Sequence, residues 1–235
     1  MIELVSWDSD FFGRKIGLVP FVASETEADA LIAEARDREF SYLSARLTPS
    51  DIPAIQILER KGFYTTDIGI VWHRGLEKIV TPQTLARQGT NTDNSIVQKI
   101  ADGLFTDARF YNDPFFSKEE ADRLYRTWAG NLLQGDADKV LLIGEEGFVA
   151  CKTAGNVGSI ILIGVSAVHQ KKGVGTELVL NALAWFKKVG MESVSVRTQA
   201  ANRGAIALYE ARGFRMKSMD ITMGRIIERN REHWV

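Results

Sequence analysis

Residues 165–175 have the sequence VSAVHQKKGVG, a short basic turn that contains two glycines. The apolar run at 160–163 predicts a buried strand before the turn, and the residues at 176–186 predict a helix after it. Glycine lets backbone approach a ligand closely, and the first N–H groups of a helix have no partner within the helix. They also lie at the positive end of the helix dipole. The segment therefore predicts a cradle for a phosphate or pyrophosphate, with Lys171 and Lys172 as neighbouring charges.

The composition is that of an ordinary globular protein, with 45% hydrophobic and 25% charged residues in a chain of 235. A net charge of −1 argues against a protein that coats nucleic acid. We see no signal-peptide pattern and no apolar run of about 18 residues, so we expect a cytoplasmic protein with no membrane partner. The single Cys151 excludes an intramolecular disulfide. The histidines are far apart in the sequence, so we expect no metal site; they are His73, His169 and His233.

The chain divides into three predicted parts. Residues 79–95 are polar and rich in turn formers, and we interpret them as a linker. It separates a small half at 1–78 from a larger half at 96–235. In the small half we expect a strand at 4–7, a loop at 8–14, and helices that begin near Ser24 or Thr26 and at Pro53. In the larger half we expect the order β-α-β-β-β-α-β-α-β, with the cradle after the fourth strand.

An internal repeat aligns residues 46–63 with 197–214, including Gly62 with Gly213. Two interpretations stay open. Any strand–helix–Gly–Phe unit looks alike, or the first half is a shortened, degenerate copy of the second. The first copy has Leu58 where the second has Tyr209, and it has no glycine turn. It could therefore share the architecture and lack the chemistry.

The turn at 170–175 fits Gln/Arg-x-x-Gly-x-Gly/Ala, and Asn202, Tyr209 and Gly213-Phe214 follow downstream. Joined at this spacing, these residues resemble the motifs of the GCN5-related N-acetyltransferase superfamily over roughly residues 95 to 230. The resemblance implies an α/β (α+β) fold with a mixed, largely antiparallel central sheet. A smaller, partial acetyltransferase-like α/β half would precede it.

The resemblance also implies a site. The amides of the turn would hold the pyrophosphate of acetyl-coenzyme A, and the preceding strand would hydrogen-bond its pantetheine arm. Tyr209 would act as the general acid on the departing thiolate, and a backbone N–H near Val165 would stabilise the oxyanion. Outside the motif, a half-buried core tyrosine would explain Tyr209 equally well. The expected set for acetyl-coenzyme A is Ile163, Val165, Gln170, Lys171, Lys172, Gly173, Val174, Gly175, Thr176, Asn202 and Ala205.

The chain departs from the family pattern at several positions. Gln170-Lys171 replaces a commoner Arg-Gly, and Ala167 replaces a frequent proline. The strand at 159–165 is apolar apart from Ser159, so it offers no carboxylate base. Either a chain of waters removes the proton from the amine, or the amine binds already neutral. We expect His169 to face solvent or pack on the helix.

The sequences WDSDFFG at 7–13 and RFYND at 109–113 resemble those of dTDP-fucosamine acetyltransferases. This resemblance implies a nucleotide-linked aminosugar as acceptor, acetylated on the 4-amino group of a dTDP-linked 4-amino-4,6-dideoxyhexose. The expected acceptor-binding residues are Arg109, Tyr111 and Asn112, with Arg109 as the cation for the diphosphate. The aromatic residues at 110–115 would offer a stacking surface for thymine, although Phe115 and Phe116 are also explained as anchors of the following helix.

Two other functions stay open: an acetyl-coenzyme A-dependent N-acetyltransferase of a protein, peptide or small amine, and a catalytically inactive acetyl-coenzyme A-binding protein. Intact Asn202 and Tyr209 argue against the second. The pattern Gly-x-x-x-x-Gly-Lys-Ser/Thr is absent, which excludes a P-loop switch. The acyl chain length, the stereochemistry of the acceptor and the oligomeric state stay open, a homodimer included.

Overall fold

The computed structural model describes residues 1–78 and 80–227 and divides the chain into two compact units. Of the described residues, unit 1 contains 1–69, 108–120 and 219–227. Unit 2 contains residues 70–107 and 121–218. These units do not coincide with the three predicted parts, because the strands β4 (Tyr64–Gly75) and β10 (Arg215–Ile226) each run from one unit into the other. Residue 79 of the expected linker and His233 lie outside the described residues.

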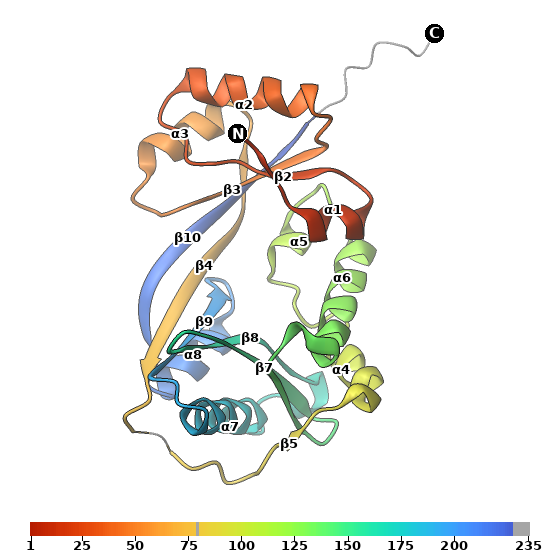
Figure 1. Ribbon diagram of the computed structural model, residues 1–235, viewed down its shortest axis with the longest axis vertical. Coiled ribbons are helices and arrows are strands. Elements are labelled where there is room, and N and C mark those ends of the chain that lie inside the picture. Colours follow the sequence, from red (N-terminus) through yellow and green to blue (C-terminus); the bar gives the residue numbers. More distant parts are fainter. Residues whose placement is uncertain (79, 228–235) are drawn as a thin grey trace. The chain divides into compact units, whose positions relative to one another are not determined.

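Unit 1 is a sheet with the strand order β1-β2-β3-β10-β4 and helices that join its strands (Figure 1). The pair β2–β3 is parallel, whereas β1–β2 and β3–β10 are antiparallel. Besides β4 and β10, its elements are β1 (Glu3–Leu4), α1 (Ser6–Phe12), β2 (Ile16–Leu18), α2 (Glu25–Asp37), β3 (Tyr42–Leu47), α3 (Ile52–Arg60) and α5 (Arg109–Asn112).

Local sequence signals explain most of unit 1. Ser24 caps α2 as predicted, because its hydroxyl accepts the N–H of Glu27 at 3.2 Å. The predicted loop at 8–14 is wrong, since α1 occupies most of it. Gly13 adopts a left-handed conformation that ends α1 and donates its N–H to Ser9. The expected strand at 4–7 therefore ends at Leu4.

Unit 2 contains a sheet with the strand order β10-β4-β9-β8-β7-β6-β5. The pair β8–β9 is parallel, and β5–β6, β6–β7 and β7–β8 are antiparallel, so the expected mixed and largely antiparallel sheet is confirmed. Its further elements are β5 (Arg87–Gln88), η1 (Asn91–Asp93), α4 (Asn94–Ala101), α6 (Lys118–Asn131, which begins in unit 1), η2 (Leu132–Asp136), β6 (Lys139–Ile143), β7 (Gly147–Ala154), β8 (Val157–Val165), η3 (Ala167–His169), α7 (Val174–Lys188), β9 (Ser193–Gln199) and α8 (Arg203–Ala211).

The two halves of the repeat have the same order of elements, β-α-β-α-β. The first copy is β2-α2-β3-α3-β4, and the second is β8-α7-β9-α8-β10. In each copy the first two strands are parallel neighbours. The last strand of each copy is placed beside the other copy's second strand: β10 pairs with β3, and β4 neighbours β9. This shared order supports the interpretation of the first half as a degenerate copy.

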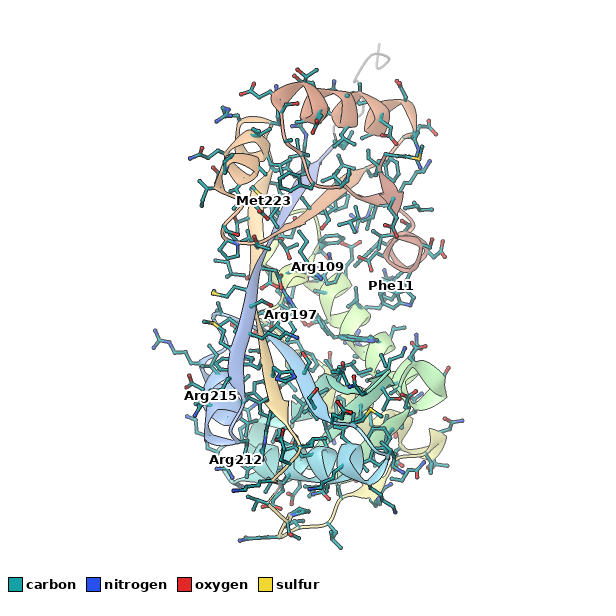
Figure 2. All side chains as sticks on the ribbon, turned by 60° about the vertical axis from the view of Figure 1, so that its left-hand side comes forward. Phe11, Arg109, Arg197, Arg212, Arg215 and Met223 are labelled. Carbon is teal, nitrogen blue, oxygen red and sulfur yellow. The ribbon has the colours of Figure 1, made fainter. Side chains whose placement is uncertain are left out.

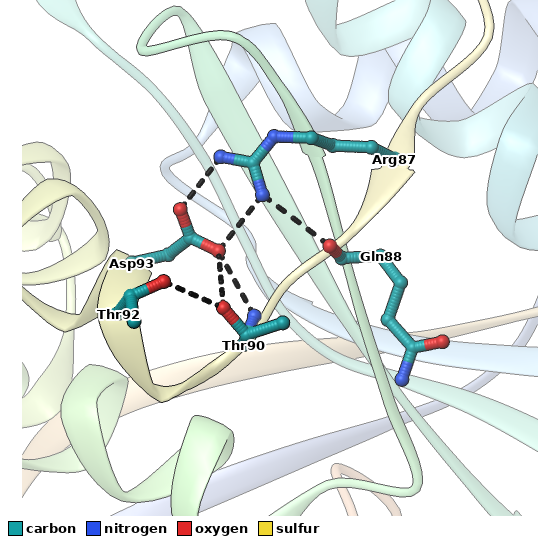
Figure 3. Close-up of polar contacts among 5 residues, drawn as sticks. All are labelled: Arg87, Gln88, Thr90, Thr92 and Asp93. Carbon is teal, nitrogen blue, oxygen red and sulfur yellow. Dashed lines mark hydrogen bonds and ion pairs between the residues drawn. The ribbon is translucent and has the colours of Figure 1, made fainter.

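The segment that we interpreted as a linker belongs to unit 2, and side-chain contacts within the segment and with α7 hold it. Arg87 forms a bidentate ion pair with Asp93, at 2.6 and 2.8 Å, and Asp93 also accepts the N–H of Thr90 (Figure 3). The hydrogen bonds from Arg87 hold the pKa of Asp93 well below its usual range. In the first turn of α7, the carboxylate of Glu177 accepts the N–H groups of residues 83 and 84. Polar composition alone does not reveal such distant partners.

Helices cover both faces of the unit 2 sheet. One face packs against α4 and α6 through a cluster that includes Val97, Ile100, Ala129, Leu132, Leu142, Phe148 and Leu162. On the other face α7 contacts β6, β7, β8 and β9. Gly158 of β8 makes the closest approach, because a Cβ there would lie 2.3 Å from the Cδ1 atom of Phe186. Phe186 is fully buried, so its ring has no space into which to move.

We predict that Gly158→Val lowers the free energy of unfolding by about 1–3 kcal/mol, the usual cost of overpacking. Gly204→Ala is the matched control, since the nearest atom to a Cβ there lies 3.7 Å away. Its free energy of unfolding should stay within about 0.5 kcal/mol of the wild-type value. Urea unfolding followed by circular dichroism measures both. Equal transition midpoints for the two variants would contradict the packing of α7 on β8.

Candidate functional site

The end of β8 separates from its parallel neighbour β9. The ladder between them pairs Val157–Ile160 with Ser193–Val196, while β8 continues to Val165 and β9 to Gln199. On the other side, Ala150 pairs with Leu162 and Cys151 with Ile160, so Ile161 is an extra residue in β8. A bulge of this kind bends a strand and increases its twist. In the part of the chain that the structure describes, the parallel ladder therefore ends at the bulge.

The backbone groups beyond the bulge have a defined direction. Ser166 donates its N–H to the carbonyl of Glu146 at 2.8 Å, so its polar groups point toward β7. Because this direction alternates along a strand, the N–H and C=O groups of Ile163 and Val165 point to the opposite edge. That is the edge from which β9 has separated. Both residues were expected to contact the pantetheine arm.

The turn after Val165 is closed by its own side chains. Ser166 Oγ lies 2.7 Å from His169 Nδ1, and His169 donates its N–H to the carbonyl of Ser166. Gln170 Nε2 donates to the carbonyl of Val165 at 3.3 Å. His169 is thus half-buried and bound within the turn. Gln170 is bound to the strand end that it was expected to flank.

The start of α7 has no capping side chain. Gly173 is the N-cap residue, with φ of 87°, and no side chain accepts the first amides of the helix. Those amides belong to Val174, Gly175 and Thr176, three of the expected residues. Lys171 and Lys172 are exposed beside them, and Lys171 has a φ of 61°, in the left-handed region that non-glycine residues rarely adopt. The turn therefore presents unpaired helix amides and two cations together.

The first copy of the repeat is closed at the equivalent place. Ser24 caps α2, and the carboxylate of Glu27 accepts the N–H of Ala23, the residue before the cap, at 2.8 Å. Pairing between β2 and β3 reaches the end of β2, and Val19 then donates to the carbonyl of Ser44 at 2.8 Å. Neither an open strand edge nor an uncapped helix is present there.

α8 holds the remaining expected residues. Asn202 Oδ1 accepts the N–H of Ala205 at 2.9 Å, so this pair caps α8 and the Ala205 amide already has a partner. The nearest atoms to a Cβ on Gly175 are Leu208 Cδ2 at 3.4 Å and Val165 Cγ2 at 3.8 Å. The end of β8, the start of α7 and α8 therefore converge at Gly175.

Tyr209 is almost fully buried, with 2% exposure, and its ring packs on Phe214 at 5.4 Å between centroids. Among the described residues, no hydrogen-bond partner accompanies its hydroxyl. Burial raises the pKa of Tyr209 above its ordinary value, so the hydroxyl is protonated at neutral pH. A protonated hydroxyl without a protein partner can still donate a hydrogen bond, which makes this atom a functional candidate.

The expected acceptor residues lie on α5, in unit 1. Arg109 Nη2 bonds Asp8 Oδ2 at 2.6 Å, and its guanidinium lies 4.2 Å from the ring centroid of Phe110. Tyr111 is half-buried and Asn112 is exposed. The structure thus groups the expected acetyl-coenzyme A residues in unit 2 and the expected acceptor residues in unit 1.

The sequence reasoning assigned no role to one buried polar residue of this segment. Asp113 is 2% exposed, and it accepts hydrogen bonds from the hydroxyl of Tyr42, from the hydroxyl of Tyr64 at 2.8 Å and from the N–H of Phe115 at 3.0 Å. Burial and the charge of Asp113 raise the pKa of Tyr42. The only signal in the sequence was an aspartate at the end of an aromatic run.

The described residues contain no group of three or more His, Cys, Asp or Glu side chains that could hold a metal ion. Among residues 1–78 and 80–227, no helix is long and apolar enough to cross a membrane.

Comparison with known proteins gives a family match over residues 104–214, to the acetyltransferase (GNAT) family. The chain is 32% identical over 101 residues to YvbK of Bacillus subtilis (strain 168), an uncharacterized N-acetyltransferase, covering 43% of this chain and 58% of YvbK. It is 26% identical over 221 residues to the spore coat polysaccharide biosynthesis protein SpsD of the same organism, covering 88% of this chain and 76% of SpsD. The chain thus spans little more than half of YvbK.

The fold is also shared with a solved structure, the GCN5-related N-acetyltransferase from Sphaerobacter thermophilus. The TM-score is 0.66 at 14% sequence identity, and the match covers 97% of this chain and 76% of that chain. The bulged strand, the glycine turn and α8 all lie within the residues that match the family. Residues 104–214 are therefore a domain of the acetyltransferase (GNAT) family.

Proposed function

We propose that the protein transfers the acetyl group of acetyl-coenzyme A to the 4-amino group of a dTDP-linked 4-amino-4,6-dideoxyhexose. The observation that supports the donor is the pairing, within a GNAT domain, of an open strand edge with an uncapped helix. The acceptor is supported by the similarity to SpsD, which is named for polysaccharide biosynthesis and matches 88% of this chain.

The residues of unit 2 fit the donor in two places. The amides of Val174, Gly175 and Thr176 can bond a pyrophosphate, with Lys171 and Lys172 adding charge. The open edge of β8 at Ile163 and Val165 can bond the amides of a pantetheine arm as an added strand would. Asn202 contributes through its amide nitrogen, because its oxygen caps α8. The Gln170 bond to Val165 has to open if the arm takes that carbonyl.

The transfer needs a proton donor and a site for negative charge. Acetyl-coenzyme A supplies an acetyl thioester, whose carbon–sulfur bond breaks as the carbon–nitrogen bond forms. The Val165 N–H, which points to the open edge, can donate to the carbonyl oxygen as charge develops there. Tyr209 holds a proton on an otherwise unpartnered hydroxyl and can deliver it to the sulfur. The nitrogen gives up its own proton to water, and water returns a proton to the Tyr209 phenolate, so that the products are the amide and the free coenzyme A thiol.

The apolar character of β8 suits an amine that binds neutral. Its side chains beyond the bulge are Ile161, Leu162, Ile163 and Val165, with Gly164 between the last two, so no carboxylate faces the open edge from this strand. Electron-withdrawing oxygens on a sugar ring lower the pKa of a ring amine relative to that of lysine. An aminosugar therefore needs less help from a general base than a lysine side chain does.

We predict that Tyr209→Phe lowers kcat with acetyl-coenzyme A and the dTDP-aminosugar by about a hundredfold or more, the usual contribution of a general acid. The Kd of acetyl-coenzyme A should change by less than about threefold, because only a hydroxyl is removed. Release of the coenzyme A thiol measures kcat, and calorimetry measures Kd. Wild-type turnover in this variant would rule out Tyr209 as the acid.

We predict that each chain binds one molecule of acetyl-coenzyme A, because the first helix of the repeat is uncapped in the second copy (α7) and capped by Ser24 in the first (α2). Gly173→Asp should weaken binding by about tenfold or more, since it places a carboxylate in the cradle at a φ that favours glycine. Ser24→Asp is the matched control at the equivalent position of α2, and aspartate is a good N-cap there. A calorimetric stoichiometry of two, or equal affinities in the two variants, would contradict the assignment.

A screen of acceptors tests the substrate itself. Thiol release should be rapid with dTDP-4-amino-4,6-dideoxyhexoses and slow with peptides and polyamines. Activity confined to peptides or polyamines would contradict the acceptor and leave the GNAT domain unaffected.

A further inference from the structure

Two of the aromatic rings that we expected to stack on thymine, those of Phe110 and Phe115, already pack on other rings within unit 1. Phe110 is 6% exposed and packs against Phe12 and Phe116. Phe115 stacks on Tyr42 with 4.8 Å between centroids, and the guanidinium of Arg14 lies 4.5 Å from the ring centroid of Phe115. A base has to find its stacking surface elsewhere.

Helix α1 presents a different aromatic pair. Trp7 and Phe11 are four residues apart, so they lie on the same side of the helix. Their rings stack with 5.4 Å between centroids and 9° between planes, and Trp7 is 41% exposed. An indole ring held parallel to a second ring presents a flat apolar surface that is already oriented.

The Trp7–Phe11 pair packs on buried aromatic rings of unit 1. Phe11 packs edge-on against Phe12, at 5.0 Å and 87°, and Phe12 is buried against Phe110 and Phe116. The stacked pair is therefore fixed to the aromatic core of unit 1, and little side-chain freedom is left to lose when a ligand binds.

The guanidinium of Arg109, on α5, is bonded to helix α1 through Asp8. Asp8 follows Trp7, is 8% exposed and bonds Arg109 Nη2 at 2.6 Å. Figure 2 labels Phe11 on α1 and Arg109 on α5. A guanidinium has donors on all three nitrogens, so the bond to Asp8 leaves Nη1 and Nε for an anion. The side chain of Arg109 is 28% exposed, which gives a ligand access to it.

We propose that Trp7, supported by Phe11, is the stacking surface for the thymine base of the acceptor, and that Arg109 binds its diphosphate. The inference rests on the proposed function, since it identifies residues that recognise the nucleotide of the same acceptor. A thymidine diphosphate presents a flat π-face and a polyanion, the two groups that an exposed indole and an adjacent guanidinium bind. Phe21, another exposed aromatic residue of unit 1, is 65% exposed and has no stacked partner among the described rings.

The test measures the affinity of dTDP for the full-length protein by calorimetry and by tryptophan fluorescence. Trp7→Ala should raise the Kd of dTDP by about tenfold, the scale of one base–aromatic stack. Trp7→Phe, which keeps a ring, should stay within about threefold of wild type and lose most of the fluorescence change. Phe21→Ala is the matched control and should bind dTDP as the wild-type protein does.

Thymidine and pyrophosphate are smaller probes that test the base-stacking surface and the diphosphate-binding cation separately. Thymidine binding should weaken in Trp7→Ala, and pyrophosphate binding should weaken in Arg109→Gln but not in Trp7→Ala. With the aminosugar, Trp7→Ala should raise KM by about tenfold and leave kcat and the KM of acetyl-coenzyme A unchanged, which a folding defect would not do.

The outcomes distinguish this inference from the function on which it rests. If the wild-type protein binds dTDP and Trp7→Ala binds it equally well, the stacking role is wrong and the acceptor stands. If the wild-type protein binds acetyl-coenzyme A but not dTDP, both the acceptor and the stacking role are wrong.

Discussion

The end of the parallel ladder at Ile160 determines what unit 2 can bind. Strand β8 has neighbours on both sides up to that residue, and the bulge at Ile161 then turns it away from β9. Unpaired backbone groups in a protein interior cost free energy, so an open edge persists only where water or a ligand reaches it. The antiparallel ladder to β7 keeps the strand extended through Val165 while the other edge is open. The glycine turn and α7 then follow directly from the end of this strand.

The two copies of the repeat have the same order of elements but differ at the end of the first strand and the start of the first helix. In the first copy Ser24 and Glu27 cap α2, an arrangement that contributes on the order of 1 kcal/mol to a helix. In the second copy the N-cap residue is Gly173, which has no side chain to cap α7. The first amides of that helix therefore stay unpaired. β2 stays paired with β3, whereas β8 separates from β9. Two local differences, a cap and a bulge, therefore distinguish the copies.

The sequence predicted the elements whose determinants are local. Ser24 at the start of α2 and Pro53 in the first turn of α3 both occur as expected. The bulge at Ile161 was not predictable, because it depends on register with β7, and an apolar strand looks the same with or without it. The exchange of β4 and β10 between the copies was missed for the same reason, since strand order depends on distant pairing.

The acceptor side shows a further limit of sequence reasoning. The motif at 109–113 was expected to supply both a cation and a stacking surface, but its aromatic residues are needed to attach the segment to unit 1. Arg14 bonds Glu120 at 2.5 Å and donates to the carbonyl of Phe115.

Asp113 adds its bonds to Tyr42 and Tyr64, and Asp8 bonds Arg109. These partners come from α1, the loop after it, β3 and β4, all within the first copy of the repeat or the residues before it. A copy that has a capped helix and a closed strand edge in place of a cofactor site thus still has a physical role, because it fixes residues 108–120 in one conformation. Retention of its architecture without its chemistry follows from that role.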